Sequence, residues 1–154
     1  MTHVFSVVSA RAMRLGSGVA VGLLLASHAA MATDINHARA QYNYQMFCQG
    51  CHTPDGSGYG DIPPLKNMMG TFLRSDEGRG FLVRVPGSAT SKLSNADLAE
   101  VLNWTLENFA GASLPEGSYE PYSAVEVAAL RAQPLQEIQA TRASILAEIA
   151  MQTP

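Results

Sequence analysis

Apolar residues recur at helical spacing in the part of the chain that precedes its two cysteines. The pattern predicts a helix over about 35–47, with Thr33 or Asp34 as its N-cap. An aspartate at this position also lies favourably at the positive end of a helix. The predicted buried face consists of Ile35, Ala38, Tyr42 and Met46. This helix would lead directly into the cysteine pair.

The clearest helical pattern begins after Ser94. Ser94 and Asp97 have the spacing of a capping box, and Gly111 is placed to end the helix. Trp104 lies beside the apolar stripe, where we expect it to pack against the core. The stripe itself consists of Leu98, Val101, Leu102, Thr105, Leu106 and Phe109.

Two more helices are predicted after a linker over 112–122. Ser123 and Glu126 form a second capping box, for a short helix that must end before Pro134. A final helix is expected over about 135–151. Its apolar face consists of Leu135, Ile138, Ile145 and Ile149. Because both helices carry apolar stripes, we expect this segment to pack onto its own chain.

The middle of the chain has weaker patterning. Residues 53–61 contain three glycines, one proline and two aspartates, a composition typical of a loop. Residues 66–73 can form a short helix or a loop, and 75–78 reads as a polar turn. The apolar segment 80–85 is expected to line the core, because six residues without a partner strand do not make a sheet. The predicted fold class is therefore all-α.

The first 32 residues differ in composition from the rest. They contain no Asp or Glu, and Arg11 and Arg14 precede an apolar run of about 12 residues. Ala30 and Ala32 have the spacing that a signal peptidase requires, so 1–32 is predicted to be a cleavable signal peptide. The apolar run is short for a membrane span, which needs about 20 residues. We expect an exported, periplasmic protein that is soluble after cleavage near Ala32.

The charge balance argues against one class of partner. The whole chain has ten Lys and Arg against thirteen Asp and Glu, and both leader arginines would be removed with the signal peptide. Eight basic and thirteen acidic side chains would remain, a net charge of −5. Without a basic cluster to meet phosphates, a nucleic-acid partner is not expected.

The candidate chemistry is concentrated in the pentapeptide 48–52, Cys-Gln-Gly-Cys-His. Cys48 and Cys51 are the only cysteines in the chain, and His52 follows at once. Two thiols at this spacing can add to the two vinyl groups of one porphyrin while the imidazole reaches the iron, as in haem c. A dithiol oxidoreductase would need alternating strands and helices, and a zinc site would need a fourth ligand. The chain shows neither pattern.

A helix, the Cys-Gln-Gly-Cys-His motif, a glycine-rich loop, a Pro-Leu pair and a capped later helix together resemble the class I cytochromes c. The resemblance covers roughly 34–110. It implies a small all-α cytochrome c fold over 33–111 that wraps one covalent haem c, followed by a C-terminal helical extension over 112–154. It also implies that the backbone carbonyl of Pro64, 12 residues beyond His52, accepts a hydrogen bond from the proximal imidazole.

The resemblance fails at the second axial ligand. In the family this is usually a methionine before the C-terminal helix, often followed by proline, but this chain has Val85-Pro86 there. Met68 and Met69 are the only methionines between the motif and that helix, and they are the candidate distal ligands. An open or water-occupied face is an alternative. Other possible ligands are Lys66, Lys92 and His37, the last of which is expected to lie exposed on the first helix.

Two functions follow from the resemblance. One is an electron-transfer protein rather than an enzyme, acting as a soluble carrier or as the haem subunit of a periplasmic dehydrogenase. Its redox partner would be a dehydrogenase, an oxidase or another cytochrome. The other is a haem protein with an open distal face that binds small ligands or peroxide. Arg74, Arg79 or Arg84 could stabilise charge in such a site, but no distal histidine is available.

Overall fold

The computed structural model describes residues 34–115, 117 and 119–152. The predicted signal peptide and its cleavage site therefore lie outside the described residues. Within the described ranges the chain is helical and contains no strand. No helix in this part of the chain is long and apolar enough to cross a membrane. In chain order the helices are α1 (His37–Phe47), α2 (Gln49–His52), the 3-10 helix η1 (Met69–Arg74), α3 (Asp76–Arg84), α4 (Pro86–Ala89), α5 (Asn95–Phe109), the 3-10 helix η2 (Gly111–Ser113), α6 (Ala124–Arg131) and α7 (Ile138–Gln152).

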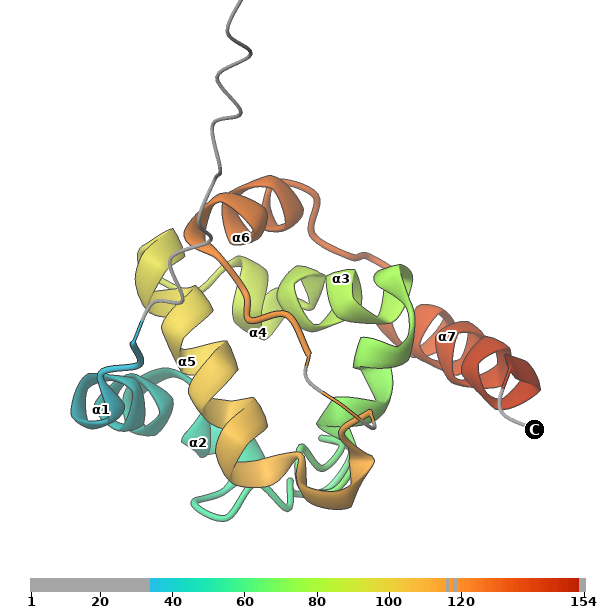
Figure 1. Ribbon diagram of the computed structural model, residues 1–154, viewed down its shortest axis with the longest axis horizontal. Helices are drawn as coiled ribbons and strands as arrows, with labels where there is room; N and C mark the ends of the chain where they lie inside the picture. The colour runs from blue at the N-terminus through green and yellow to red at the C-terminus, as the bar shows by residue number, and fades with distance from the viewer. Residues whose placement is uncertain (1–33, 116, 118, 153–154) are drawn as a thin grey trace, which may run out of the picture. The chain divides into compact units, whose positions relative to one another are not determined.

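Helix α1 packs against α5 through an aromatic cluster (Figure 1). The ring of Tyr44 on α1 lies 5.4 Å from Trp104 and 5.1 Å from Phe109 on α5, measured between ring centroids. At the edge of the contact, Arg39 donates two hydrogen bonds of 2.7 and 2.8 Å to the carboxylate of Glu100. The expectation that Trp104 packs against the core is confirmed, since its side chain is buried.

The predicted face and cap of α1 were wrong. Helix α1 begins at His37 with Asn36 as its N-cap, whose side chain accepts from the N–H of Arg39. Tyr42 and Met46 are 58% and 59% exposed, and the buried residues are Ala40, Asn43 and Tyr44. The spacing of apolar residues within α1 does not decide which face of the helix is buried. The aromatic rings of α5 decide it, because they pack against Tyr44 and not against Tyr42.

The capping boxes of the two later helices were predicted correctly. The side chain of Ser94 accepts from the N–H of Asp97 at 3.1 Å, at the start of α5. The side chain of Ser123 accepts from the N–H of Glu126 at 3.1 Å, at the start of α6. Each bond satisfies a backbone donor that the first turn of a helix leaves free.

Helix α3 occupies the segment for which a polar turn and a short apolar stretch were predicted. The side chain of Ser75 caps it by accepting from the N–H of Gly78 at 3.0 Å, and Asp76 and Glu77 follow in the first turn. Gly78 suggested a turn, but it lies inside the helix. A larger residue does not fit there, because a Cβ would collide with the backbone carbonyl of Phe72. Close packing of α3 on η1 thus explains the glycine. The expected core-lining role of this segment is confirmed by the burial of its apolar side chains.

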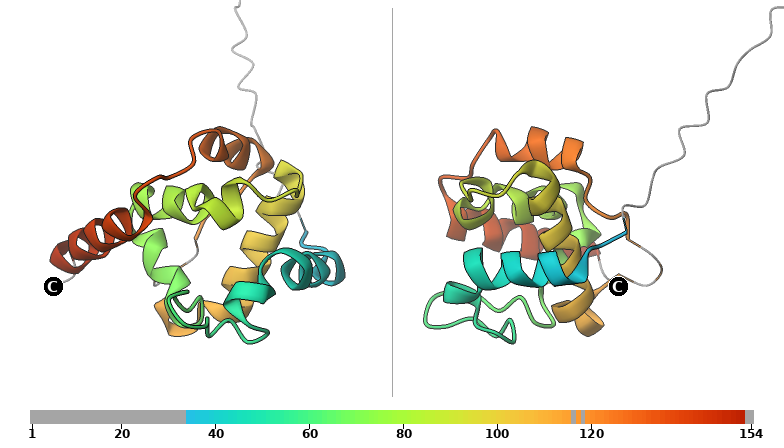
Figure 2. Two further views of the ribbon diagram at one scale, coloured as in Figure 1. Left: turned by 180° about the vertical axis from the view of Figure 1, so that it is seen from behind. Right: turned by 90° about the vertical axis from the view of Figure 1, so that its left-hand side faces the viewer.

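The C-terminal helices pack onto the same core. Helix α6 lies against α3 and α5, and α7 lies against η1 and α3 (Figures 1 and 2). Val127, Ile145 and Ile149 belong to the hydrophobic core that the earlier helices form. The described residues cluster as one compact unit. The expectation that the extension packs onto its own chain is therefore confirmed.

The side chain of Arg131 ties α6 to the segment between α4 and α5. Its guanidinium donates to the backbone carbonyls of Ala89, Ser91 and Leu93 at 2.7–3.1 Å, and to Oδ1 of Asn95 at 3.1 Å. These four bonds fix the segment that, by the family resemblance, should carry the distal ligand.

Candidate haem site

The cysteine pair lies on one turn of helix directly after α1. Cys48 is the C-cap of α1, and its N–H donates to the carbonyl of Tyr44 at 2.9 Å. The carbonyl of Cys48 then accepts from the N–H groups of Cys51, at 3.1 Å, and of His52, at 3.0 Å. This short turn gathers both thiols and the imidazole, and all three line the same cavity.

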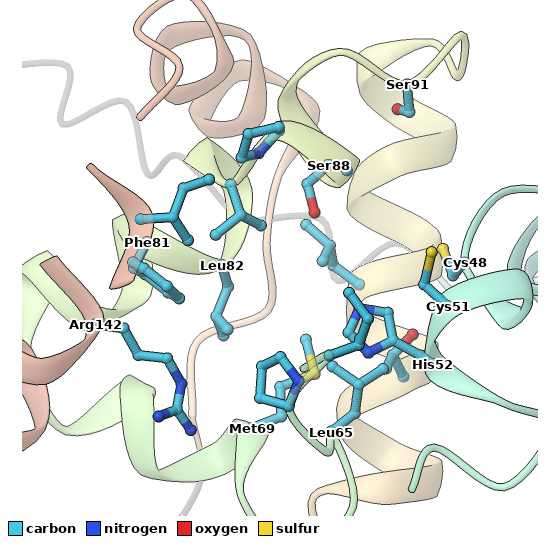
Figure 3. Close-up of a pocket in the computed structure, with 18 of the residues that line it drawn as sticks. Cys48, Cys51, His52, Leu65, Met69, Phe81, Leu82, Ser88, Ser91 and Arg142 are labelled. Carbon is cyan, nitrogen blue, oxygen red and sulfur yellow. The ribbon is translucent and has the colours of Figure 1, made fainter. Parts of the chain in front are cut away.

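The cavity has a volume of about 650 Å³, within the usual range for sites that hold a cofactor. Figure 3 shows His52, Leu65 and Met69 on one side of it, with Phe81, Leu82 and Ser88 on the other. Most of the lining is apolar, and α1, η1, α3, α5 and α7 all contribute to it, as do the segments 61–65 and 85–93. A flat, apolar group larger than any side chain suits such a space.

The environment of His52 favours the neutral imidazole, which could serve as a metal ligand. Burial lowers the pKa of His52, and the backbone carbonyl of Pro63 opposes that shift. A neutral imidazole keeps a lone pair for a metal ion. Nδ1 of His52 is buried and has no hydrogen-bond partner. The backbone of Pro63, one residue before the expected Pro64, lies near enough to the ring to act on its pKa, and both prolines line the cavity. A hydrogen bond from Nδ1 to the carbonyl of Pro64 stays a prediction.

Hydrogen bonds to backbone carbonyls hold the loop after His52 and fix which of its residues lie against the imidazole. The hydroxyl of Tyr44 donates to the carbonyl of Thr53 at 2.6 Å, and the N–H of Gly58 donates to the carbonyl of His52 at 3.2 Å. Gly58 has a φ of +76°, and a Cβ there would collide with the carbonyl of Ile62. Farther along, the N–H of Leu65 donates to the carbonyl of Gly56 at 2.8 Å. The chain is therefore fixed on both sides of the imidazole.

Both thiols are free of a disulfide. Cys48 is half-buried, and its burial, with a smaller effect of the neighbouring Cys51, raises its pKa to about 11. Cys51 is exposed. Since the thiolate is the reactive form, the Cys48 thiol is unreactive toward oxidants at neutral pH.

Residues 37–107 match the family model described as Cytochrome c. This part of the chain is a cytochrome c domain. Neither the curated proteins nor the solved structures contain a match to the chain. Cytochrome c domains bind haem, transfer electrons and exchange them with redox partner proteins, and this one implies a covalently bound haem c. The apolar cavity, the two thiols and the neutral imidazole fit that group.

The segment before α5 contributes no strong iron ligand to the cavity of the cytochrome c domain. The described residues that it places in the lining are Val85, Pro86, Gly87, Ser88, Ser91 and Leu93. Among them only the two serines carry a polar side chain. Oγ of Ser91 is buried without a hydrogen-bond partner, so a hydroxyl donor is available in this part of the lining.

The two candidate methionines differ in their positions. Met69 is 3% exposed and lines the cavity, whereas Met68 packs against the core outside the lining. The N–H of Met69 donates to the carbonyl of Leu65 at 2.9 Å, and both side chains line the cavity together with His52 (Figure 3).

None of the other proposed ligands lines the cavity. Lys66 is ion-paired with Asp55 at 3.4 Å, and Lys92 is exposed. His37 is exposed as expected, with its Nε2 4.0 Å from a carboxylate oxygen of Glu107. These side chains lie away from the haem cavity of the cytochrome c domain.

The three arginines considered from the sequence also lie outside the lining. Arg74 is exposed, Arg79 is paired with Glu126 at 2.6 Å, and Arg84 donates to the carbonyl of Gln133 at 2.9 Å. The arginine in the lining is Arg142 of α7. The sequence carries a signal for it, because a charge at 142 falls on the helical stripe formed by Ile138, Ile145 and Ile149.

Proposed function

We propose that the mature chain is an exported monohaem cytochrome that transfers single electrons, as a soluble carrier or as the haem subunit of a periplasmic dehydrogenase. Cys48 and Cys51 would hold the haem by thioether bonds, and His52 would bind its iron from the proximal side. The observation that carries the proposal is the convergence of these three side chains on one apolar cavity. The Nδ1–H of His52 would donate to the carbonyl of Pro64 or of the neighbouring Pro63, whose backbone raises the pKa of the ring.

One-electron exchange requires no acid, base or nucleophile from the chain. When bound, the haem supplies a one-electron iron couple. The protein holds the imidazole neutral and oriented, and its apolar side chains keep water away from the cavity. Low polarity disfavours the ferric state, which carries the extra positive charge.

Electrons would enter and leave at the cysteine side of the cavity. Phe47 and Ile62 line the cavity and are 44% and 37% exposed, and Cys51 beside them is exposed. A redox partner protein that covers these side chains would come close to the porphyrin edge. The nearby Asp61 is an exposed cavity-lining carboxylate, which favours a partner with a positive docking patch.

Expression of the full chain in a bacterium that matures c-type cytochromes tests the proposal. We expect a periplasmic protein that begins at Thr33, retains haem through denaturing electrophoresis and shows reversible one-electron reduction. Mass spectrometry of the intact protein measures both the cleavage site and the attached haem. A cytoplasmic product, or one without covalent haem, would contradict the proposal.

We propose a second function, which is reversible binding of a small ligand such as carbon monoxide at the iron. The lining on the side away from His52 favours it. That side presents Ser88 and, in the same loop, the buried unpartnered hydroxyl of Ser91, but no thioether, imidazole or amine. The methionine that lines the cavity, Met69, belongs to η1 and not to this segment. We therefore propose an open distal face.

Replacement of Met69 and Met68 separately with leucine distinguishes the open face from methionine ligation. We expect the wild-type ferrous protein to bind carbon monoxide rapidly, and its ferric form to lack the weak near-infrared band of methionine-ligated haem. Both variants should have the same spectra as the wild type. A near-infrared band that disappears in Met69→Leu but persists in Met68→Leu would overturn the open face and establish Met69 as the distal ligand.

A further inference from the structure

Helix α7 brings one guanidinium to the haem cavity. Arg142 lies one turn into this helix, is half-buried and belongs to the lining. Among the described residues that line the cavity, Arg142 is the only Lys or Arg. Its guanidinium carbon lies 5.7 Å from the centroid of the Phe72 ring on η1. The side chain therefore crosses from the C-terminal extension to the wall of the cytochrome c domain.

Arg142 lacks the acceptors that the other half-buried arginines have. Arg79 is bound to Glu126, Arg84 to a backbone carbonyl, and Arg131 to four acceptors. Within the described ranges Arg142 makes no hydrogen bond or ion pair, and its contact is the face of Phe72. A half-buried guanidinium with no anion or acceptor beside it has donors left to bind one, so this position suits an anionic group inside the cavity.

The chemistry of haem c indicates that the anion at this position would be a haem propionate. The two vinyl groups that react with cysteines and the two propionates lie at opposite edges of the porphyrin. Figure 3 shows Cys48 and Cys51 on one side of the cavity and Arg142 on the far side. With the thioethers formed at the cysteines, the propionate edge faces α7. The charged residues otherwise in the lining, Asp61 and Glu137, are exposed carboxylates, which cannot pair with a propionate.

We propose that Arg142 binds a haem propionate and thereby couples α7 to the haem. The proposal rests on the proposed function, because it requires covalent haem at Cys48 and Cys51. Ile145 and Ile149 hold α7 in the core, so the guanidinium is preorganised for bidentate binding of a carboxylate. The residues that precede Arg142 line the cavity from Gln136 to Ala140, so the start of α7 closes over the same edge.

The midpoint potential of the holoprotein tests the charge at this position. In Arg142→Gln we expect a lower potential, because the loss of a nearby positive charge favours the ferric state. Without Arg142 the pKa of the propionate rises, so the potential should also fall more steeply with pH in the weakly acidic range. Glu137, in the turn before α7, is the other charged lining residue near this edge, since η1 and α3 contribute only uncharged side chains to the lining and Asp61 lies at the cysteine side. Arg142→Lys should restore most of the potential.

Arg74→Gln is the matched control, because it removes the same charge from an exposed position on η1 outside the lining. It should leave the potential and its pH dependence unchanged. Hydrogen exchange supplies a second readout. Backbone amides in the first turns of α7 should exchange at least about tenfold faster in Arg142→Gln holoprotein, as expected for loss of one charge-assisted hydrogen bond.

Two results would overturn the inference. One is a potential and an exchange rate in Arg142→Gln equal to those of the wild type, with haem still covalently bound. The other is an equal loss in Arg74→Gln, which would make the effect one of net charge. A wild-type protein without covalent haem would instead refute the proposed function, so the two failures are distinguishable.

Discussion

Replacement of both Cys48 and Cys51 with serine is expected to abolish covalent haem attachment and, in the absence of added haem, the native fold. The thioethers cannot form, and a cavity of about 650 Å³ would be left in the core. At about 24 cal/mol per Å³, an empty cavity of this size would cost roughly 16 kcal/mol as an upper bound. The whole stability of a domain is about 5–15 kcal/mol. The chain therefore cannot keep the cavity open without its occupant.

Haem-dependent staining after denaturing electrophoresis and far-ultraviolet circular dichroism measure the two losses. The single variant Cys51→Ser is the control, since Cys48 can still form one thioether and His52 remains. We expect it to keep haem and most of its helicity. A double-serine protein with native helicity and cooperative unfolding in the absence of haem would contradict the prediction.

Gly78→Ala is expected to lower the free energy of unfolding of the holoprotein by roughly 2–4 kcal/mol. A Cβ at Gly78 would collide with the backbone carbonyl of Phe72, which is not the flexible end of a side chain and cannot move aside. Relief would require α3 to shift away from η1. That shift would separate the stacked rings of Phe72 and Phe81, whose centroids are 5.1 Å apart and which both line the cavity.

Gly80→Ala, two positions later in the same helix, is the matched control. A Cβ at Gly80 would lie 3.4 Å from Cδ2 of Leu130, which is ordinary contact with a flexible side chain. Alanine is favoured over glycine in a helix interior by up to about 1 kcal/mol, so this variant should be unchanged or more stable. Chemical denaturation of both holoproteins measures the difference. Equal stabilities would show that η1 and α3 do not pack as closely as described.

The features that the sequence predicts well are those decided by neighbouring residues. Ser94 and Ser123 cap their helices because each hydroxyl reaches a backbone N–H three residues along the chain. By contrast, the buried face of α1 depends on Trp104 and Phe109, about 60 residues away, and the pattern within α1 does not reveal it. The glycines of α3 are ambiguous for the same reason, because a turn and a close helix contact both require them.

In the candidate site, too, the features decided by neighbouring residues are predicted well and those decided by distant residues are not. Cys48, Cys51 and His52 lie within five residues, so one helical turn suffices to bring them to one cavity. Which proline carbonyl lies against the imidazole is harder to predict, because the course of that loop depends on bonds to distant groups such as the hydroxyl of Tyr44. Arg142 was missed because its position depends on how α7 packs against η1 and α3.

The hydrogen bonds of Arg131 limit which part of the chain could be fused to another protein as a working domain. The family match ends at residue 107, yet the guanidinium that holds the segment before α5 belongs to α6, beyond that point. Val127 and Ile145 complete the core from the same region. A gene fusion that joined residues 37–107 to another protein would transfer the haem motif without the residues that support the opposite wall. A working fusion would therefore have to carry the C-terminal helices together with the haem motif.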